Sequence, residues 1–499
     1  MNAIKKRNLS ELLSGIKDAP STKITGICDD SRNIKKGDVF FAFQGDISHG
    51  MDYLEIVIEA GAAAIIYELP YANITENNFN IPIIGVDSLN KYKGEIANRW
   101  HNNISKKLKI IGITGTNGKT TVAALIQSCL HSLGHICGYI GTLGLGIYEL
   151  EDSNLTTPSN FKLHQVLADF YRQGAKFVVM EVSSHSIAQN RIAGIPFDAT
   201  MFTNLTQDHL DYHKNMRSYG EIKSKLFTEI ESKIKIINCI DDFGKKLSKE
   251  IQKDVIEITN ITVPREYKGL FLNIEKSTAN GLGYSVSIQS SWGHKEFNLP
   301  LIGAFNVENA SQVIALLLSY NFNFHKIISA IKSLTPPKGR MQLVSLTSNK
   351  RLPKVYIDFA HTPEALKLAL IALRSHYDSN IWCVFGCGGD RDQGKRKLMG
   401  HIAEKYSDYV VITSDNPRAE DPKNIINDIL EGVEEDVEIF EDRAKAIQYA
   451  IQTASDRDII LIAGKGHEGY QLISDSRITF VDNDHADRAL KNRLNISND

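Results

Sequence analysis

The segment Gly115 to Thr121 combines small, hydroxyl-bearing and cationic residues in an order that is typical of phosphate binding. An apolar, β-branched run, Leu108 to Ile113, precedes it, and apolar residues at helical spacing from Val122 to Leu133 follow it. We therefore expect a strand-to-helix turn whose backbone N–H groups hold phosphates while Lys119 reaches the terminal one. The Thr120 hydroxyl is placed to bind the accompanying Mg²⁺. The residues expected to contact the nucleotide here are Gly115, Thr116, Asn117, Gly118, Lys119, Thr120 and Thr121.

This segment departs from the general phosphate-loop pattern at one position. The pattern has a glycine five residues before Gly118, where this chain has Ile113, and Gly112 is out of register. The match is therefore to a shorter variant, Gly-Thr-Asn-Gly-Lys-Thr-Thr. The departure counts against a phosphate-loop NTPase that works as a mechanical or regulatory switch, although that alternative stays open.

Two polar segments directly follow predicted strands. Glu181 ends the strand-like run that starts at Phe177, and His209 comes shortly after the run Ala199 to Thr203. Ligands of parallel sheets bind beyond the carboxyl ends of the strands, so Glu181 is positioned to hold Mg²⁺ and His209 to add a single imidazole ligand. We expect His213 to pack in the interior. A zinc site is disfavoured because no third soft ligand lies nearby in the sequence.

The overall composition excludes several classes of protein. The 57 Lys and Arg and 59 Asp and Glu residues give a formal net charge of −2, which argues against a nucleic-acid or anionic-membrane surface. The six cysteines are scattered without a CxxC pair, which indicates a reducing compartment without disulfides. No apolar run approaches the ~18 residues of a membrane span, and Met1 to Ser14 lacks the apolar region of a signal peptide. We expect a cytoplasmic monomer without membrane insertion.

The length of 499 residues is too large for one hydrophobic core and indicates about three domains. A polar stretch at residues 103–109 and the Pro-Pro and Lys-Gly pairs in Thr335 to Arg340 mark two boundaries. Alternating strand-like and helical runs predict α/β domains with mostly parallel sheets. We expect a small N-terminal α/β domain at residues 1–105, a central phosphate-loop domain at 106–336 and a Rossmann-like C-terminal domain at 337–499. The other predicted strands are Val39 to Phe43, Ala63 to Tyr67, Ile81 to Val86, Ile234 to Cys239, Val355 to Asp358, Ile381 to Phe385, Tyr409 to Thr413 and Ile459 to Ala463.

Three motifs at their observed separations resemble the Mur ligases of peptidoglycan synthesis. They are the Gly-Thr-Asn-Gly-Lys-Thr-Thr loop, Glu181-Val-Ser-Ser-His185 and Thr203-Asn-Leu-Thr-Gln-Asp-His-Leu-Asp-Tyr-His213. The resemblance runs over nearly the whole chain, and its further motifs are Tyr219 to Phe227, Gly303 to Asn309, Gly339 to Gln342, Ile357 to Pro363 and Gly464 to Glu468. It implies a three-domain, ATP- and Mg²⁺-dependent enzyme that adds an amino acid to a UDP-N-acetylmuramoyl (UDP-MurNAc) chain.

The resemblance also implies a modified lysine. In this family the lysine four residues after the tyrosine of the Tyr219 motif is carbamylated, and its carbamate supports a second Mg²⁺; that position is Lys223 here. Lys225 is the rival, but it is two residues off the register, and a solvated lysine on a helix face is the alternative without the resemblance. The expected catalytic residues are Lys119, Glu181, His209 and Lys223. The expected metal ligands are Thr120, Glu181, His209 and Lys223.

The substrate contacts follow from the same resemblance. The segment Cys28 to Arg32 resembles part of the family's UDP-binding domain, and Ser31 is expected to contact the uridine diphosphate. The sugar and peptide of UDP-MurNAc-L-Ala-D-Glu are expected to contact Thr156, Thr157, Ser183, Gln189 and Arg191. Further nucleotide contacts are expected at Asn306, Asn309, Arg340 and Asp358.

The added amino acid is indicated by the tetrapeptide Asp415-Asn-Pro-Arg418, which resembles the family members that use meso-2,6-diaminopimelate. Diaminopimelate differs from lysine by a distal carboxylate, which a guanidinium binds through two charge-assisted hydrogen bonds. A lysine substrate would instead bring its ammonium against Arg418. The residues expected to form this pocket are Arg391, Asp415, Asn416, Pro417, Arg418, Gly464 and Glu468. Two departures from the family are Lys397, where proline is usual, and Phe359, where tyrosine is frequent.

The implied reaction forms an amide through an acyl phosphate made from ATP, with catalysis by positioning and electrostatics. Three readings compete with it: the same ligase with L-lysine as substrate, a ligase like the folylpolyglutamate synthetases, and a non-catalytic relative of the ligases. The tetrapeptide at Asp415, the Gly464-Lys-Gly-His-Glu468 motif and the Asp-Ser-Arg sequence at Asp30 separate the chain from the folate enzymes. The presence of all four expected catalytic side chains disfavours a non-catalytic relative.

Overall fold

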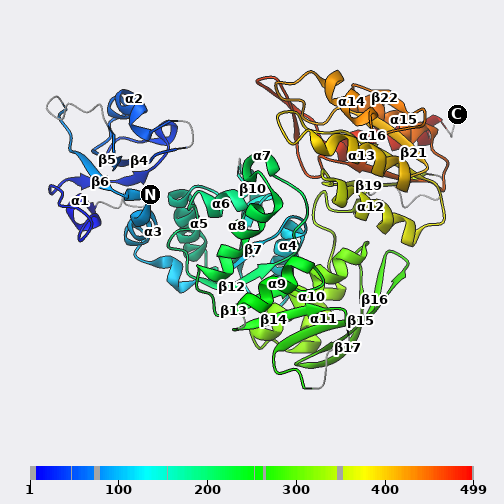
Figure 1. The fold of residues 1–499 in the computed structure, drawn as a ribbon, viewed down its shortest axis with the longest axis horizontal. Coiled ribbons are helices and arrows are strands. Elements are labelled where there is room, and N and C mark those ends of the chain that lie inside the picture. Colours follow the sequence, from blue (N-terminus) through cyan, green and yellow to red (C-terminus); the bar gives the residue numbers. More distant parts are fainter. Residues whose placement is uncertain are drawn as a thin grey trace. The chain divides into compact units, whose positions relative to one another are not determined.

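The structure is a computed structural model of the chain, and it describes residues 7–45, 48–71, 79–153, 155–251, 253–261, 266–344 and 352–496. The contacts among residues divide the chain into two compact units. The first unit comprises Met1–Gly112, His135–Asp198 and Ile230–Ser232, and the second comprises Ile113–Gly134, Ala199–Glu229 and Lys233–Asp499. The helices and strands of the two units are labelled in Figure 1.

The first unit begins with a four-stranded parallel sheet in the order β3-β4-β5-β6. Alternate side chains of its central strands face two separate clusters: Phe41 and Ile66 pack with the helix α3, whereas Phe40 and Ile65 pack with α2. The sheet is therefore covered by helices on both faces, and the α/β fold expected for the N-terminal domain is present. The elements are β3 (Gly26–Cys28), β4 (Asp38–Ala42), α2 (Leu54–Glu59), β5 (Ala64–Leu69), β6 (Ile83–Asp87) and α3 (Leu89–Trp100).

The rest of the first unit contributes four strands in the order β10-β9-β8-β11. The pair β8 and β11 is parallel and fully buried, and β9 and β10 continue it in antiparallel fashion. The elements are β8 (Cys137–Gly141), β9 (Gly144–Gly146), β10 (Leu150–Glu151), α5 (Asn160–Arg172), β11 (Phe177–Glu181) and α6 (Ser184–Ala188).

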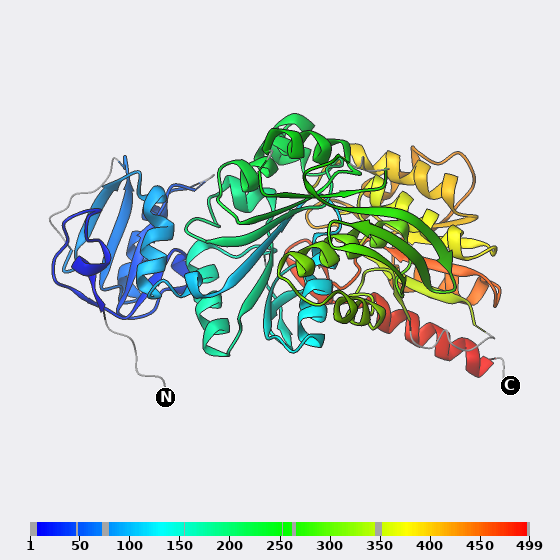
Figure 2. The same cartoon turned by 90° about the horizontal axis from the view of Figure 1, so that it is seen from below.

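In the second unit, β12 to β15 are parallel and are followed by an antiparallel meander of β15, β16 and β17. The meander, drawn in green in Figure 2, was not predicted from the sequence. The strands are β12 (Phe197–Phe202), β13 (Ile234–Asn238), β14 (Val255–Thr259), β15 (Leu270–Asn280), β16 (Gly283–Ser290) and β17 (Gly293–Leu299). The helices are α4 (Lys119–Ser132), α7 (Leu210–His213), α8 (Met216–Thr228), α9 (Asp242–Ile251), α10 (Ala304–Ser319) and α11 (Phe324–Lys332). The strand β7 (Lys109–Thr114) runs from the first unit into the second.

The C-terminal part of the second unit is a six-stranded sheet in the order β18-β19-β23-β20-β21-β22, parallel except for β18. One core cluster joins one face of the sheet to α12, α13 and α14, and another joins the other face to α15 and α16. The strands are β18 (Gln342–Leu343), β19 (Lys354–Asp358), β20 (Ile381–Phe385), β21 (Tyr409–Thr413), β22 (Glu438–Phe440) and β23 (Ile459–Ala463). The helices are α12 (Pro363–His376), α13 (Gly394–Tyr406), α14 (Pro422–Leu430), α15 (Arg443–Thr453) and α16 (Asp482–Ile496), and a hairpin consists of β24 (Tyr470–Ile473) and β25 (Ser476–Thr479).

Two observations concern the chain as a whole. The six cysteines are all buried and free, as the sequence predicted. No helix among the described residues is both long enough and apolar enough to cross a membrane.

Candidate active site

Two glycines shape the turn between β7 and α4. Gly115 has a φ of 146° and Gly118 a φ of 85°, which side-chain-bearing residues rarely adopt. A Cβ atom would lie 1.9 Å from Thr203 Oγ1 at Gly115 and 2.8 Å from Asn309 Oδ1 at Gly118. The first turn of α4 consists of Lys119, Thr120, Thr121 and Val122. The turn therefore brings bare backbone and a helix N-terminus together, which is the arrangement that binds phosphate groups.

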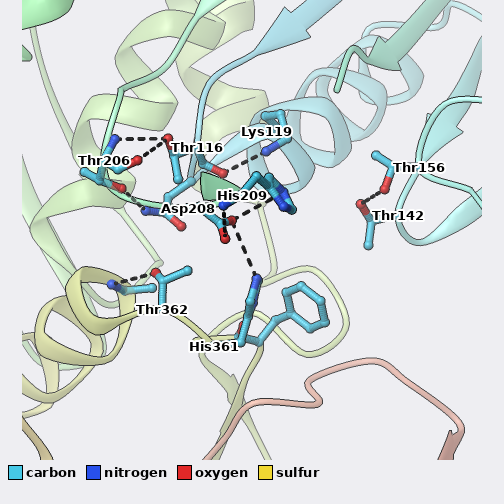
Figure 3. A network of polar contacts seen from close by, with 12 residues as sticks. Thr116, Lys119, Thr142, Thr156, Thr206, Asp208, His209, His361 and Thr362 are labelled. Atoms are coloured by element: carbon cyan, nitrogen blue, oxygen red, sulfur yellow. Dashed lines mark hydrogen bonds and ion pairs between the residues drawn. The ribbon is translucent and has the colours of Figure 1, made fainter. Parts of the chain in front are cut away.

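The segment after β12 holds the backbone of this turn. The backbone N–H of Asn117 donates to the side-chain Oδ1 of Asn204 (2.9 Å), and the backbone N–H of Thr116 donates to the carbonyl oxygen of Asn204 (2.8 Å). The Thr116 hydroxyl donates to the carbonyl oxygen of Thr206 at 3.1 Å (Figure 3), and the Thr203 hydroxyl donates to that of Asn117 at 2.6 Å. The conformation of the turn is thus fixed by the protein alone.

Two lysines converge on the turn. Lys119 Nζ donates to the carbonyl oxygens of Gly115 (2.9 Å) and Thr116 (2.7 Å), and Lys223 Nζ donates to the same Gly115 oxygen at 2.9 Å. The Lys223 side chain is buried and lies over the Tyr219 ring, 4.4 Å from its centroid. Burial, and after it the charge of Lys119, lowers the pKa of Lys223 well below its ordinary value. Both effects favour the unprotonated form of the Lys223 amine.

Two predictions concerning α7 and α8 can be compared with the structure. Lys225, the rival of Lys223, points to solvent with a 41% exposed side chain and pairs with Glu229 at 3.2 Å. The burial of Lys223 therefore favours Lys223 as the functional lysine. His213 is buried with its ring 5.1 Å from that of Tyr219, so the prediction that it packs in the interior is confirmed.

A largely buried carboxylate, Asp208, lies between two histidines (Figure 3). Its Oδ2 is 3.4 Å from His209 Nε2 and 4.0 Å from His361 Nε2, and its Oδ1 accepts from the backbone N–H of His209 at 2.9 Å. Burial alone would raise the pKa of Asp208, but His209, His361 and Lys395 bring it below its ordinary value. Asp208 therefore stays ionised and orients His209, whose left-handed φ of 55° turns the chain at this point.

Arg340 contacts the phosphate-loop helix. Its Nη2 donates to Thr120 Oγ1 at 3.0 Å, and its guanidinium lies 4.4 Å from the centroid of the Phe359 ring. Phenylalanine at this position thus retains the aromatic face, although it lacks the hydroxyl of tyrosine. Asp358 accepts two backbone N–H groups, at 2.7 and 2.8 Å. Burial raises the pKa of Asp358 above its ordinary value, although Arg340 and these N–H groups oppose the rise.

Asn306 and Asn309 lie on the first turns of α10, and both are buried. Asn306 Nδ2 donates to the carbonyl oxygen of Ile302 at 2.8 Å, and its Oδ1 accepts from Asn309 Nδ2 at 3.1 Å. Asn309 Oδ1 in turn faces Gly118 of the phosphate loop. The pair therefore links α10 to the loop.

In the first unit, Glu181 ends β11 with its side chain completely buried. Its Oε1 accepts from the Tyr139 hydroxyl (2.7 Å) and the backbone N–H of Thr142 (2.8 Å), and its Oε2 accepts from the Thr142 hydroxyl (3.1 Å). The Thr142 hydroxyl is also 3.4 Å from that of Thr156 (Figure 3). These three donors fix the orientation of the carboxylate.

The other residues expected to hold the acceptor gather next to Glu181. The buried Thr157 hydroxyl donates to the Glu181 carbonyl oxygen (2.8 Å) and accepts from the Ser183 N–H (3.2 Å). Arg191 donates to the carbonyl oxygen of Thr157 (2.9 Å) and, through Nε, to Gln189 Oε1 (3.0 Å). Ser183 also caps α6. The Thr157 hydroxyl thus has a structural role in joining two segments of this region.

Ser31 begins a short 3₁₀ helix (Ser31–Asn33) that Asp30 caps. Beside it, Asp29 forms a largely buried ion pair with Lys93 at 3.0 Å and accepts from the Ser159 hydroxyl at 3.2 Å. The strand-to-helix turn that carries Ser31 is therefore tied to the start of α5 within the first unit.

A second polar group surrounds Asn416 in the C-terminal sheet. Asn416 Nδ2 donates to Glu468 Oε2 at 2.8 Å, and the fully buried Lys465 Nζ donates to Asn416 Oδ1 (3.1 Å) and to Glu468 Oε2 (2.9 Å). Gly464 has a φ of 115°, and a Cβ there would lie 2.5 Å from Asp415 Oδ2. Burial raises the pKa of Asp415, against the opposing effect of Lys465.

Arg418 and Arg391 flank the same glycine. A Cβ at Gly388 would lie 2.8 Å from Arg418 Nη1 and 3.9 Å from Arg391 Cγ. Arg418 Nη1 also donates to the carbonyl oxygen of Gly389 at 2.7 Å, and a Cβ at Gly389 would lie 1.9 Å from the carbonyl oxygen of Pro417. Burial, and after it the charge of Arg391, lowers the pKa of Arg418. Two arginine side chains that meet at one glycine, near enough for the charge of Arg391 to affect Arg418, make a site suited to an anion.

The expected residues therefore form three groups. The second unit contains one group around the phosphate loop and another around Asn416 and Arg418, whereas Glu181 and the residues expected to hold the acceptor lie in the first unit. Three members of these groups were not predicted: Asp208, His361 and Lys465. The only signal for them was their place in the quoted motifs, beside His209, Phe359 and Gly464. Within the described ranges, no group of three or more His, Cys, Asp or Glu side chains is arranged to hold a metal ion.

Comparison with known proteins gives three family matches along the chain. Residues 23–101 match the Mur ligase family catalytic domain, residues 113–317 the Mur ligase middle domain, and residues 339–466 the Mur ligase glutamate ligase domain. The matched segments include the phosphate loop, Asp208, Lys223, Asn416 and Lys465.

Full-length relatives agree with these matches. UDP-N-acetylmuramoyl-L-alanyl-D-glutamate--2,6-diaminopimelate ligase of Haemophilus influenzae (strain PittGG) is 39% identical over 92% of this chain and 94% of its own length. The protein of that name from Coxiella burnetii (strain RSA 493 / Nine Mile phase I) is 40% identical over 97% of this chain and 99% of its own. A solved structure of a ligase of that name is 30% identical, covers 98% of this chain and 100% of its own, and has a TM-score of 0.66. The chain belongs to the Mur ligase family.

Proposed function

We propose that this protein joins meso-2,6-diaminopimelate to UDP-MurNAc-L-Ala-D-Glu with hydrolysis of ATP to ADP and phosphate, as a step in peptidoglycan precursor synthesis. The observation that carries the choice of amino acid is the convergence of Arg418 and Arg391 around Gly388. Two adjacent guanidinium groups repel each other unless an anion lies between them. The distal carboxylate of diaminopimelate supplies that anion, and lysine has none. The names of the relatives support the same substrate.

Glu468 provides a partner for the positively charged ammonium group of the amino acid. Glu468 Oε2 already accepts from Asn416 and Lys465, which fixes the position of the carboxylate. Its second oxygen is then oriented for an ammonium group of the substrate. The pocket residues in this proposal are Arg391, Asp415, Asn416, Pro417, Arg418, Gly464 and Glu468.

The reaction proceeds in two steps. The terminal carboxylate of the acceptor attacks the γ-phosphorus of ATP and breaks its bond to the bridging oxygen of the β-phosphate, so that an acyl phosphate forms and ADP leaves. The amine of diaminopimelate then attacks the acyl carbon, and phosphate leaves from the tetrahedral intermediate. Lys119 and the N–H groups of the Gly115–Thr121 turn hold the phosphoryl oxygens, so the protein acts by positioning and by charge. Asn306, Asn309, Arg340 and Asp358 hold the nucleotide from α10 and from the residues around β18 and β19.

The donor set of the chain fits Mg²⁺. A hydroxyl at Thr120, a carboxylate at Glu181, an imidazole at His209 and a carbamate on Lys223 are predominantly oxygen donors, as a hard cation requires. Bound Mg²⁺ supplies positive charge that offsets the negative charge of the phosphoryl oxygens. The buried, neutral amine of Lys223 supports carbamylation, because only an unprotonated amine combines with CO₂.

The acceptor is held by the first unit in this proposal. Ser31 contacts the uridine diphosphate, and the peptide and sugar contact Thr156, Thr157, Ser183, Gln189 and Arg191. The functional domains are residues 1–105, 106–336 and 337–499, and the protein works as a monomer in the cytoplasm. Six buried free cysteines support a reducing compartment.

The test is a measurement of ADP release with ATP, Mg²⁺ and UDP-MurNAc-L-Ala-D-Glu, with diaminopimelate and L-lysine offered separately. The proposal predicts release that depends on both the acceptor and diaminopimelate, with little release in the presence of lysine. Equal release with lysine would overturn the choice of amino acid. Release that needs no acceptor would favour a phosphate-loop switch instead.

A further inference from the structure

We propose that the ion pair between the buried Arg396 and the partly exposed Glu420 positions the two guanidinium groups of the amino-acid pocket and thereby sets the selectivity for the amino acid. The inference rests on the proposed function, because the pocket is the one assigned there to diaminopimelate. Neither residue belongs to the pocket set, and each acts only through the loops that carry Arg391 and Arg418.

The pair joins two loops at the same edge of the C-terminal sheet. The strands β20 and β21 are parallel neighbours, so the loops that follow them, residues 386–393 and 414–421, leave the sheet side by side. The first loop carries Arg391 and the second carries Arg418. The distance between the two guanidinium groups therefore depends on how the two loops are held together.

Arg396 lies at the start of α13 and is only 1% exposed. It donates to Glu420 Oε1 at 2.8 Å, to Asp428 Oδ2 on α14 at 2.7 Å and to the carbonyl oxygen of Gly388 at 3.3 Å. One side chain thus contacts the first loop, the second loop and the helix after the second loop. The hydrogen bond from Arg396 lowers the pKa of Glu420, which favours the ionised carboxylate.

Glu420 transmits the contact to the first loop. The Oε1 atom that binds Arg396 also accepts from the backbone N–H of Asp390 at 2.5 Å, and Asp390 Oδ2 accepts from the backbone N–H of Ala419 at 3.1 Å. Asp390 has a left-handed φ of 51° and directly precedes Arg391. Ala419 directly follows Arg418. The two hydrogen bonds between the loops therefore involve Asp390 and Ala419, the residues next to Arg391 and Arg418.

The opposite ends of the same two strands provide a matched control. Arg374 donates to Asp408 Oδ2 at 2.5 Å and to the carbonyl oxygen of Ser379 at 2.9 Å, and Asp408 Oδ2 accepts from the backbone N–H of Ile381 at 2.7 Å. This arginine–carboxylate pair joins the segments that lead into β20 and β21. It has the same chemistry and the same two strands, but it lies at the edge away from the pocket.

The experiment compares Glu420→Ala, Glu420→Gln and Asp408→Ala with the wild-type enzyme by ADP release. We expect Glu420→Ala to raise the KM for diaminopimelate and to lower the ratio of kcat/KM for diaminopimelate over lysine by at least about tenfold, since small displacements of positioning groups have effects of this size. The KM values for ATP and for the acceptor should change little. Asp408→Ala should lower the unfolding temperature without changing the selectivity ratio.

The Glu420→Gln variant separates geometry from charge. Glutamine keeps an oxygen that accepts from Arg396 and Asp390, so we expect it to retain most of the selectivity that Glu420→Ala loses. An equal change of the ratio in Glu420→Ala and Asp408→Ala would overturn the inference, and so would a Glu420→Gln variant as unselective as Glu420→Ala. Failure of the wild-type enzyme to use diaminopimelate would count against the proposed function rather than against this inference.

Discussion

Lys119 and Lys223 donate to one backbone oxygen, the carbonyl of Gly115, each at 2.9 Å. Two ammonium groups this close repel each other, and the repulsion is strongest where water is excluded. Lys223 is the buried member and has the lowered pKa, so it is the one that loses its proton. Carbamylation would then replace a repulsion by an attraction, because a carbamate is negative and Lys119 is positive.

The first prediction concerns Lys119. The change Lys119→Ala should abolish acceptor-dependent ADP formation, because the terminal phosphate loses its cation. The fold should persist, since the lysine lies on a turn, where its Nζ donates to the carbonyl oxygens of Gly115 and Thr116, and substitutions outside the hydrophobic core are usually mild in their effect on stability. ADP release and thermal unfolding measure the two effects. A variant that turns over normally would show that the phosphate assignment is wrong.

The second prediction concerns the modification of Lys223. The change Lys223→Ala should leave an almost inactive enzyme that a short carboxylic acid in solution partly restores, because the acid occupies the place of the carbamate. The matched control is Lys225→Ala, which removes an exposed lysine two residues away on the same helix and should keep its activity. Near-normal activity of Lys223→Ala without added acid would contradict the carbamate.

The carbamate itself can be observed. With ¹³C-labelled bicarbonate, the wild-type enzyme and Lys225→Ala should show a carbamate carbon signal that Lys223→Ala lacks. The signal should weaken as the pH falls through the lowered pKa of Lys223, because the protonated amine cannot react with CO₂.

Buried parallel strands were the part of the fold that the sequence predicted best. The strands Phe177–Glu181, Ile381–Phe385, Tyr409–Thr413 and Ile459–Ala463 have the bounds expected from their apolar runs. Such strands are apolar on both faces, so the run and the strand coincide. The meander β15–β17 was missed because its strands are polar on one face, as in Leu270–Asn280, where exposed Glu and Lys side chains interrupt the apolar pattern.

The phosphate loop was predictable from the sequence, whereas the contacts made by distant residues were not. Its function follows from local residue types, glycines at the turn and Lys-Thr-Thr at the helix start. The burial of Lys465 follows instead from tertiary packing, since lysine is rarely buried and the neighbouring residues in the sequence do not indicate that this one is. The same holds for Asp208 and His361, which are about 150 residues apart in sequence and meet only in the folded unit.

The third prediction concerns stability in acid. His164 on α5 is buried, and its Nε2 is 3.1 Å from the carbonyl oxygen of Ala193, so the neutral ring fits its site. Burial lowers the pKa of His164 from 6.5 to about 4. The folded state binds its proton less well than the unfolded state, so this stabilisation is complete above about pH 6.5 and is lost as the pH falls towards 4. A shift of this size corresponds to roughly 3 kcal/mol.

Urea unfolding at pH 7 and at pH 4.5 measures this effect. The change His164→Gln should reduce the loss of stability between the two pH values, because glutamine keeps a donor for Ala193 without a titrating ring. The exposed His401 provides the control, and His401→Gln should leave the pH dependence unchanged. Identical pH dependence in the wild-type protein and in His164→Gln would contradict the assignment.

The last prediction concerns the selectivity for the amino acid. The change Arg418→Ala should reduce mainly the use of diaminopimelate, because removing one partner of a buried charge pair costs ~2–5 kcal/mol, or well over tenfold in selectivity. Lysine use should stay low or rise slightly, since the removal of a repulsion does not create a new pocket. The apparent affinities for ATP and for the acceptor should barely change, because the phosphate loop and the first unit keep all their side chains. Equal proportional losses with both amino acids would mean that Arg418 is structural, acting through its hydrogen bond to Gly389 rather than through the substrate.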